Sequence, residues 1–279
     1  MIACEAATWM QALGSAVTMV VRGDQLLTNQ EPFAAQAVLK SLRRSGVDVR
    51  FNATVTNCER SEARDTRLGR VHGGAVRLTL EQGDPIEADE ILVAVGRRPR
   101  LNDLGLEQIE LNQNDPSAWP DWLVTGGDAS GEAPLTHWGK YRARVIGAQL
   151  GGADEPELDD VPVPQVIFTD PQVAQVGPLQ GELPDAVAVR VPFNSAAGAA
   201  LLRDHVVGEA QLLVDPTDRV VRAATFVGPE AGELLHAATI AIVGRVPVHL
   251  LRHAVPSYPT ASELWLRLLE ELPREFRSA

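Results

Sequence analysis

Cysteine and basic residues are both scarce in this chain. Among its 279 residues there are two cysteines, Cys4 and Cys58, and they form neither a Cys-x-x-Cys pair nor part of a metal-ligand cluster. The 25 lysines and arginines are outnumbered by 37 aspartates and glutamates, which gives a net charge of −12. An acidic chain of this kind lacks the basic surface that binds nucleic acid, and anionic membrane surfaces would repel it.

Long apolar runs are also missing. No stretch approaches the ~20 apolar residues that a membrane-spanning helix needs, and the first residues lack the basic segment of a signal peptide. The Gly-x-Ser-x-Gly motif of the α/β hydrolases is absent as well, and no set of Ser, His and Asp stands out in its place. We therefore expect a cytoplasmic protein with no membrane span and no nucleic-acid partner.

The first fifty residues alternate between helical and strand patterns. Apolar and small residues recur at helical spacing in IACEAATWMQALG (2–14), and a short β-branched run, VTMVV (17–21), follows. A second amphipathic helix is predicted over 32–46 and another short strand over 47–51. This helix–strand–helix–strand order predicts a parallel sheet with crossover helices.

The middle of the chain has a different pattern. Alternating polar and apolar residues over 53–95 predict an antiparallel meander, and a strand within 89–100 is expected to end at its glycine. A further strand is predicted over WLVTGGD (122–128), and a helix over 136–152.

The last third of the chain predicts a separate α+β unit. The acidic, proline-rich segment 153–164 is the clearest domain boundary. Beyond it, alternating strands are joined by a hairpin turn at 215–218, and a helix is predicted from about Pro229 to Gly244. Thr260 and Glu263 have the spacing of a capping box at the start of the final helix.

Four segments resemble, in the same order, the signatures of one family. They are ILVAVGRRPR (91–100), WLVTGGDASGEAPLTHWGKYRARVIGAQL (122–150), VPQVIFTDPQVAQVG (163–177) and HAVPSYPTASELW (253–265). The chain resembles the FAD-dependent pyridine nucleotide–disulfide oxidoreductases, which include dihydrolipoamide dehydrogenase, glutathione reductase and mercuric reductase. Four signatures in the family's order are far more specific than any one of them alone.

The resemblance implies an α/β plus α+β fold with three parts. Residues 1–90 would form part of an NAD(P)-binding Rossmann-like domain, and 91–160 would form the C-terminal segment of an FAD-binding domain. Residues 161–279 would form the α+β dimerisation domain through which the family makes homodimers.

In this family the first NAD(P)-binding strand runs into a glycine-rich turn whose backbone amides approach the pyrophosphate. Here Met1 stands just past those glycines, and the family's FAD-binding half, with its redox-active cysteine pair, does not precede it. The resemblance therefore predicts an N-terminally truncated form of an NAD(P)H-dependent FAD oxidoreductase. A misplaced start, or a missing half supplied by another chain, are the alternatives.

For FAD, the resemblance implies a site around the GGD stretch of Gly127 and Asp128. A carboxylate at the end of a strand can accept a hydrogen bond from a ribitol hydroxyl. The flavin ring would lie against four residues of the following stretch, Pro134, Leu135, Thr136 and His137. The alternatives are an ordinary turn aspartate at Asp128 and a helix cap at Thr136.

For the nicotinamide nucleotide, the resemblance implies roles for Glu5, Gly96 and Arg22. Glu5 corresponds to a glutamate on the nicotinamide side, and Gly96 would let the backbone approach the cofactor. Arg22 stands at the tip of the second strand, where arginine holds the 2′-phosphate of NADP, so NADPH is favoured over NADH. Alternatively Arg22 is a surface arginine and Asp24 binds the ribose of NAD. Arg97 is expected to tie down a loop.

The C-terminal signature departs from the family at the position of its acid/base histidine. That position holds Tyr258, while the glutamate that orients the histidine is kept as Glu263. A phenol, with an ordinary pKa of ~10, exchanges protons poorly near neutral pH compared with an imidazole at ~6.5. Disulfide reduction is therefore doubtful, and a quinone or another small electron acceptor is expected. His253 lies five residues upstream and cannot take the same place without a rearranged loop.

A second function class stays open. Because the glycine turn and the cysteine pair are absent from this sequence, the chain could serve as a non-catalytic dimerisation or interaction module. FAD and NAD(P) are expected for the intact form, whereas binding of either by this chain alone is doubtful.

Overall fold

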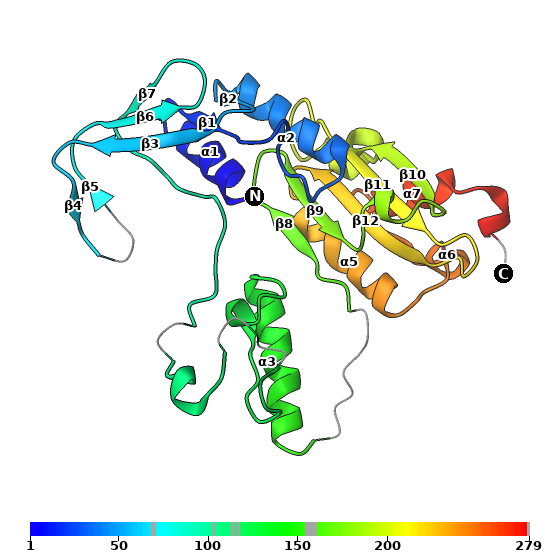
Figure 1. Ribbon diagram of the computed structural model, residues 1–279. Helices are drawn as coiled ribbons and strands as arrows, with labels where there is room; N and C mark the ends of the chain where they lie inside the picture. The colour runs from blue at the N-terminus through cyan, green and yellow to red at the C-terminus, as the bar shows by residue number, and fades with distance from the viewer. Residues whose placement is uncertain (68–70, 102–103, 113–114, 116–117, 154–160, 278–279) are drawn as a thin grey trace. The chain divides into compact units, whose positions relative to one another are not determined.

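A computed structural model describes residues 1–67, 71–101, 104–112, 115, 118–153 and 161–277 (Figure 1). The chain divides into two compact units, one formed by Met1–Ala94 with Pro164–Ala279 and the other by Val95–Val163. Within the described part, no helix has both the length and the apolarity needed to cross a membrane. Most of the expected linker, residues 154–160, lies outside the described residues.

The first unit begins with a small parallel βαβ element. Helix α1 (Ile2–Ala12) leads to β1 (Thr18–Val20), and α2 (Pro32–Arg44) crosses over to β2 (Asp48–Arg50). The two strands pair in parallel, as the sequence pattern predicts. Proline stands at the first helical position of α2, where the missing N–H costs no hydrogen bond.

An antiparallel meander follows, again as predicted. Its main sheet has the order β3 (Val55–Arg60), β6 (Val76–Leu80) and β7 (Ile86–Ala88). A two-stranded ribbon pairs β4 (Arg64–Asp65) with β5 (Val71–His72). Buried and exposed residues alternate along β6. This pattern is typical of a strand in a sheet that has one buried face and one face exposed to solvent.

The side chain of Arg60 holds the end of the meander. Its Nη2 lies 2.6 Å from Oε1 of Glu90 and donates to the carbonyl oxygen of Asp89, while its Nη1 donates to the carbonyl oxygen of Val71. The hydrogen bond from Arg60 lowers the pKa of Glu90 to about 2, with a smaller contribution from His72. The segment that leaves β7 is thereby fixed to β3.

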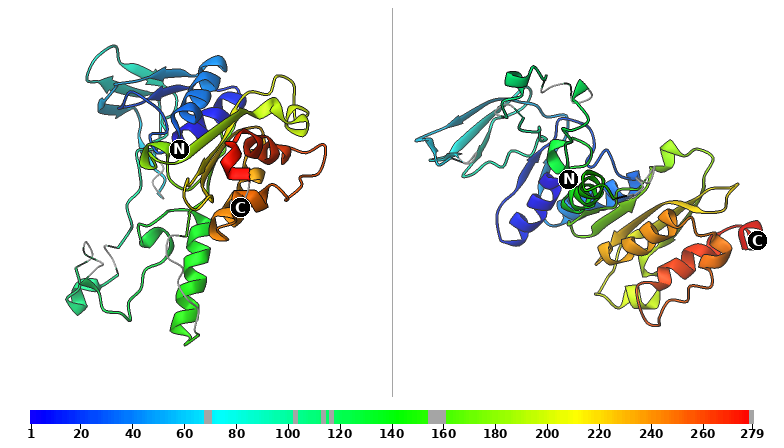
Figure 2. Two further views of the ribbon diagram at one scale, coloured as in Figure 1. Left: turned by 90° about the vertical axis from the view of Figure 1, so that its right-hand side faces the viewer. Right: turned by 90° about the horizontal axis from the view of Figure 1, so that it is seen from below.

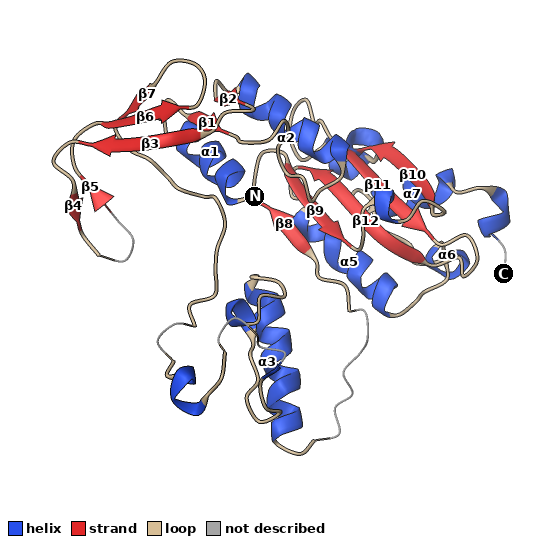
Figure 3. Ribbon diagram, in the orientation of Figure 1, coloured by secondary structure: helices blue, strands red, loops and turns tan. Residues whose placement is uncertain are grey.

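A five-stranded antiparallel sheet forms the centre of the C-terminal part (Figure 3). Its order is β10 (Val187–Pro192), β11 (Glu209–Val214), β12 (Val221–Gly228), β9 (Gln172–Val176) and β8 (Gln165–Ile167). The hairpin turn between β11 and β12 is the predicted one. Asp215 accepts hydrogen bonds from the backbone N–H groups of Asp218 and Thr217, and these lower the pKa of Asp215.

The two faces of this sheet differ in chemistry. One face carries an apolar core formed with α4 (Ala197–Ala200), α5 (Gly232–Val243), α6 (Val248–Leu251) and α7 (Glu263–Glu271). The other is covered by α1 and α2 (Figure 2). On that second face a row of polar residues crosses all five strands: Arg190, Gln211, Thr225, Gln175 and Gln165.

Side chains from the N-terminal part hydrogen-bond to this polar face. The amide Nε2 of Gln30 donates to Oε1 of Gln165 at 2.8 Å, and the backbone N–H of Gln180 donates to Oε1 of Glu31 at 2.7 Å. Gln180 opens the short 3₁₀ turn η4 (Gln180–Glu182). Two further 3₁₀ turns among the described residues of this unit are η5 (Phe193–Ser195) and η6 (Arg274–Arg277).

The predicted capping box at the start of α7 does not form. Thr260 instead donates its hydroxyl to the carbonyl oxygen of Ser257 at 2.7 Å, and α7 begins at Glu263 itself. The Glu263 carboxylate accepts a hydrogen bond from the backbone N–H of Gly198. A tertiary contact therefore takes the carboxylate that a local cap would have used.

The described residues of the second unit include α3 (Thr136–Leu150) and the 3₁₀ turns η1 (Leu106–Ile109) and η3 (Gly127–Ala129). Helix α3 confirms the prediction for 136–152. The strands predicted within 89–100 and over 122–128 do not form among the described residues. Their apolar side chains stay exposed: Leu92, Val93, Val95 and Trp122. A strand needs a hydrogen-bonding neighbour, and the described residues provide none here.

Candidate cofactor-binding sites

The residues implied in flavin binding lie together in the second unit. Gly127 and Asp128 form the turn η3, and Leu135 is the N-cap of α3. A Cβ added to Gly139 would lie 3.2 Å from the Cα of Gly127, so the turn packs closely on the first part of the helix. The GGD stretch and residues 134–137 are thus neighbours, and both belong to one compact element.

Arg97 ties this element together, as expected for a loop-fixing arginine. Its Nη1 lies 3.2 Å from Oδ2 of Asp128, and its Nη2 donates to the carbonyl oxygen of Pro134 at 3.0 Å. The side chain of Asp128 is 66% exposed, so the carboxylate keeps acceptor sites open to a second donor. A ribitol hydroxyl would be a suitable donor.

The start of α3 differs from one sequence expectation. Thr136 is the first residue of the helix and not its cap, because Leu135 holds the N-cap position and makes no side-chain cap. Just before it, Glu132 accepts hydrogen bonds from the indole N–H of Trp138 and pairs with Arg142. His137 is exposed on the first turn of the helix. Because the N-terminus of α3 has no side-chain cap, it could face the phosphates of a flavin nucleotide.

The residues implied in nicotinamide nucleotide binding are divided between the units. Glu5 on α1 accepts a hydrogen bond from the backbone N–H of Phe168 at 2.8 Å, which joins α1 to the segment after β8. Arg22 is exposed two residues beyond the end of β1, and among the described residues it has no ion-pair partner. Its guanidinium is therefore free to hold a phosphate. Gly96 belongs to the second unit and has φ of +126°, a conformation that favours glycine.

The structure separates the side chains of Tyr258 and Glu263. Tyr258 is 77% exposed, whereas Glu263 is 9% exposed and accepts the Gly198 N–H at 3.3 Å. Gly198 also packs directly on the backbone of Thr260. Helix α4 therefore packs against the loop that carries Tyr258, while the phenol of Tyr258 is exposed to solvent.

Sequence reasoning missed two contacts that shape these sites. The bond from Phe168 to Glu5 joins residues 163 positions apart, and no local pattern could indicate it. Gly198 stands in an alanine-rich stretch that gives no sign of a close backbone approach. Gly139, in contrast, lies within the quoted 122–150 segment, and its position on the first turns of a predicted helix beside GGD was a usable signal.

Comparison with known proteins places these elements in one family. Residues 1–118 match the model for pyridine nucleotide-disulphide oxidoreductases, and residues 163–268 match the model for the dimerisation domain of the same oxidoreductases. The chain belongs to the pyridine nucleotide-disulphide oxidoreductase family. The predicted fold, a mixed α/β part followed by an α+β dimerisation domain, is confirmed.

Curated relatives of this chain include dihydrolipoyl dehydrogenases from two bacteria. The one from Geobacillus stearothermophilus is 28% identical over 283 residues, covering 96% of this chain and 58% of its own length. The one from Bacillus subtilis is 27% identical over 277 residues, which are 94% of this chain and 57% of the relative. The chain thus spans somewhat over half the length of the relatives that it matches.

Solved structures give the same picture of the fold. The HOCl-induced flavoprotein disulfide reductase RclA from Escherichia coli superposes with a TM-score of 0.83 at 22% identity, and the match covers 98% of this chain and 63% of RclA. LpdA from Mycobacterium tuberculosis superposes with a TM-score of 0.81 at 22% identity, and the match covers 96% of this chain and 58% of LpdA.

Proposed function

We propose that this chain provides the nucleotide-binding and dimerisation parts of an NADPH-dependent FAD oxidoreductase that reduces a quinone or another small acceptor, and not a disulfide. The observation that carries the proposal is Tyr258 at the position of the family's acid/base histidine. A dithiol leaving group needs a nearby group that exchanges protons near neutral pH, and a phenol does this poorly. A quinone takes up its protons from water and needs no such base.

Each cofactor would be held by residues already placed above. Arg22 would bind the 2′-phosphate of NADPH through its guanidinium fork, since no carboxylate among the described residues competes for it. Asp128, fixed by Arg97, would accept a hydrogen bond from the flavin nucleotide, and the N-terminus of α3 would face its phosphates. When bound, the nicotinamide and flavin groups supply the hydride and electron transfer.

The acceptor is tested in the intact flavoprotein that carries this chain. NADPH oxidation with benzoquinone should exceed the rates with lipoamide and with glutathione disulfide. Tyr258→His should raise disulfide turnover and leave quinone turnover unchanged, whereas Tyr258→Phe should change neither. Fast disulfide turnover by the unmodified enzyme would refute the proposal.

The nucleotide preference is tested by charge reversal at Arg22. Arg22→Glu should raise KM for NADPH and shift preference toward NADH, because it removes the phosphate partner and introduces repulsion. Arg44→Glu is the matched control, since Arg44 is an exposed arginine at the far end of α2. Equal or better use of NADH by the parent enzyme would count against the assignment.

We also propose a homodimer formed through the dimerisation domain. Helices α5 and α6 expose three large apolar residues, Ile240, Val243 and Leu250. Large apolar side chains left exposed in a dimerisation domain are candidates for the interface of a twofold dimer. Sedimentation over a range of concentrations should show a dimer that Ile240→Asp dissociates. Val71→Asp, on the distant β5, should leave it intact.

A second candidate is a non-catalytic dimerisation module. The exposed apolar residues of 89–100 and 122–128 favour it, because neither segment forms a strand in the part of the chain that the structure describes. Flavin absorbance of the protein isolated from its source organism distinguishes the two candidates. A colourless dimer supports the module, and bound flavin near stoichiometry supports the enzyme.

A further inference from the structure

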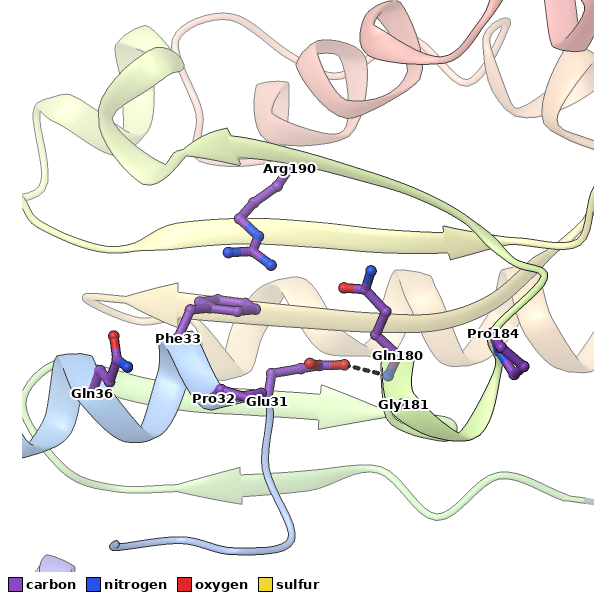
Figure 4. A pocket seen from close by; sticks show the side chains of 8 residues that line it. All are labelled: Glu31, Pro32, Phe33, Gln36, Gln180, Gly181, Pro184 and Arg190. Atoms are coloured by element: carbon purple, nitrogen blue, oxygen red, sulfur yellow. Dashed lines mark hydrogen bonds between the residues drawn. The ribbon is translucent and has the colours of Figure 1, made fainter.

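A pocket of about 570 Å³ lies apart from the residues assigned to either cofactor. It opens where the first turn of α2 meets η4 and the edge strand β10 (Figure 4). Its polar lining consists of Glu31, Gln36, Gln180 and Arg190, and Phe33 with three neighbouring proline and glycine residues supplies the apolar part. The pocket therefore lies at the seam, the contact between α2 and the five-stranded sheet, within one unit.

Arg190 supplies the positive charge of the pocket. Its guanidinium carbon lies 4.2 Å from the centre of the Phe33 ring, so the ring orients the guanidinium group. Among the residues that the structure describes, no carboxylate forms an ion pair with it. A fork of N–H donors held in this way matches a carboxylate on a ligand.

Glu31 supplies the opposite charge. Its Oε1 is fixed by the backbone N–H of Gln180 at 2.7 Å, and no described residue binds its other oxygen. Gln180 is itself fixed from below, because its Oε1 accepts a hydrogen bond from Gln211 at 2.8 Å. The carboxylate is thus oriented, and it keeps one acceptor for a donor from a ligand.

A ligand with a single charge meets attraction from one of these groups and repulsion from the other. A small zwitterion satisfies both, and the ring of Phe33 beside the proline residues suits an apolar or aromatic body. We propose that this pocket binds a free α-amino acid with an apolar or aromatic side chain, its carboxylate on Arg190 and its ammonium group on Glu31. Because the ligand would contact both sides of the seam, it would also strengthen the contact between α2 and the sheet.

Three related probes test the proposal with the full chain. This binding test does not depend on the proposed oxidoreductase activity. L-Phenylalanine carries both charges, 3-phenylpropionate lacks the ammonium group, and 2-phenylethylamine lacks the carboxylate. Titration followed by protein NMR should show saturable binding of L-phenylalanine, and each single-charge probe should bind roughly tenfold more weakly. No saturable binding of L-phenylalanine, or equal binding of either other probe, would overturn the proposal.

Two variants and a control complete the test. Arg190→Gln and Glu31→Gln should each weaken L-phenylalanine binding roughly tenfold, because each removes one charged partner. Arg267→Gln, an exposed arginine on α7 outside the pocket, should not change binding. Arg190 is exposed and its loss should not impair folding, so unchanged affinity in that variant refutes the assignment even if Glu31→Gln misfolds.

Discussion

Substitution of Gly198 by alanine should destabilise the loop that carries Tyr258. A Cβ added to Gly198 would lie 2.2 Å from the carbonyl carbon of Thr260 and 2.3 Å from its Cα and N. These are backbone atoms and cannot swing away as a side chain would. Overpacking costs about 1–3 kcal/mol, and three backbone clashes place this site near the upper limit.

A smaller gain opposes this cost, because Gly198 lies within α4 and alanine is about 1 kcal/mol better than glycine inside a helix. The net loss in the free energy of unfolding should be about 2 kcal/mol, which lowers the melting temperature by about 4–8 °C for a unit of this size. Urea unfolding followed by circular dichroism and tryptophan fluorescence measures it. Trp265 on α7 packs against Phe226 and so reports on this part of the core.

The matched control is Gly23→Ala, because a Cβ at Gly23 would meet nothing within 4 Å. Its stability should stay within about 0.5 kcal/mol of the parent, the usual range for a surface substitution. If Gly198→Ala proved as stable as this control, the close approach of α4 to Thr260 would not exist in solution, and the reasoning would be wrong.

Three further changes test other parts of the fold. Because the pKa of Glu90 is lowered to about 2, its pair with Arg60 should stabilise the meander at neutral pH. This stabilisation should weaken below pH about 4.3 and be lost as the pH falls through about 2. Amide exchange in β6 and β7 measures it, and Arg60→Gln should abolish this pH dependence. Phe226→Ala, at a fully buried ring, should cost about 3–5 kcal/mol in urea unfolding, and a cost below 1 would contradict the core described. Gly147→Ala on an open face of α3 should raise helical stability by about 0.5–1 kcal/mol, and a loss would show a neighbour there.

The helices of this chain are predictable from local sequence because their signals lie within them. Periodic apolar residues define α1, α2 and α3, and proline or glycine stands at the start of α2 and just beyond the ends of α1 and α2. The strands predicted within 89–100 and over 122–128 fail for the opposite reason. Their apolar composition is right, yet a strand exists only with a paired neighbour, and the described residues supply none there.

The candidate sites follow the same rule. The grouping of Asp128 with Arg97 and the start of α3 arises among residues close in sequence, and the quoted signatures indicated it. The bond from Phe168 to Glu5, and the pocket between Glu31 and Arg190, join segments more than 150 residues apart. These contacts depend on how α1 and α2 pack on the five-stranded sheet. The local sequence pattern of either segment alone does not specify that packing.

The polar row across the five-stranded sheet also protects its strand alignment. Successive side chains of a strand point to opposite faces, so a shift of any strand by one residue would exchange its polar member with an apolar neighbour. A slip of β11 would turn Gln211 into the core around Phe226 and expose Leu212 or Ala210 to the polar face. Since an unpartnered buried amide is costly, misaligned pairings are penalised strand by strand as the sheet assembles.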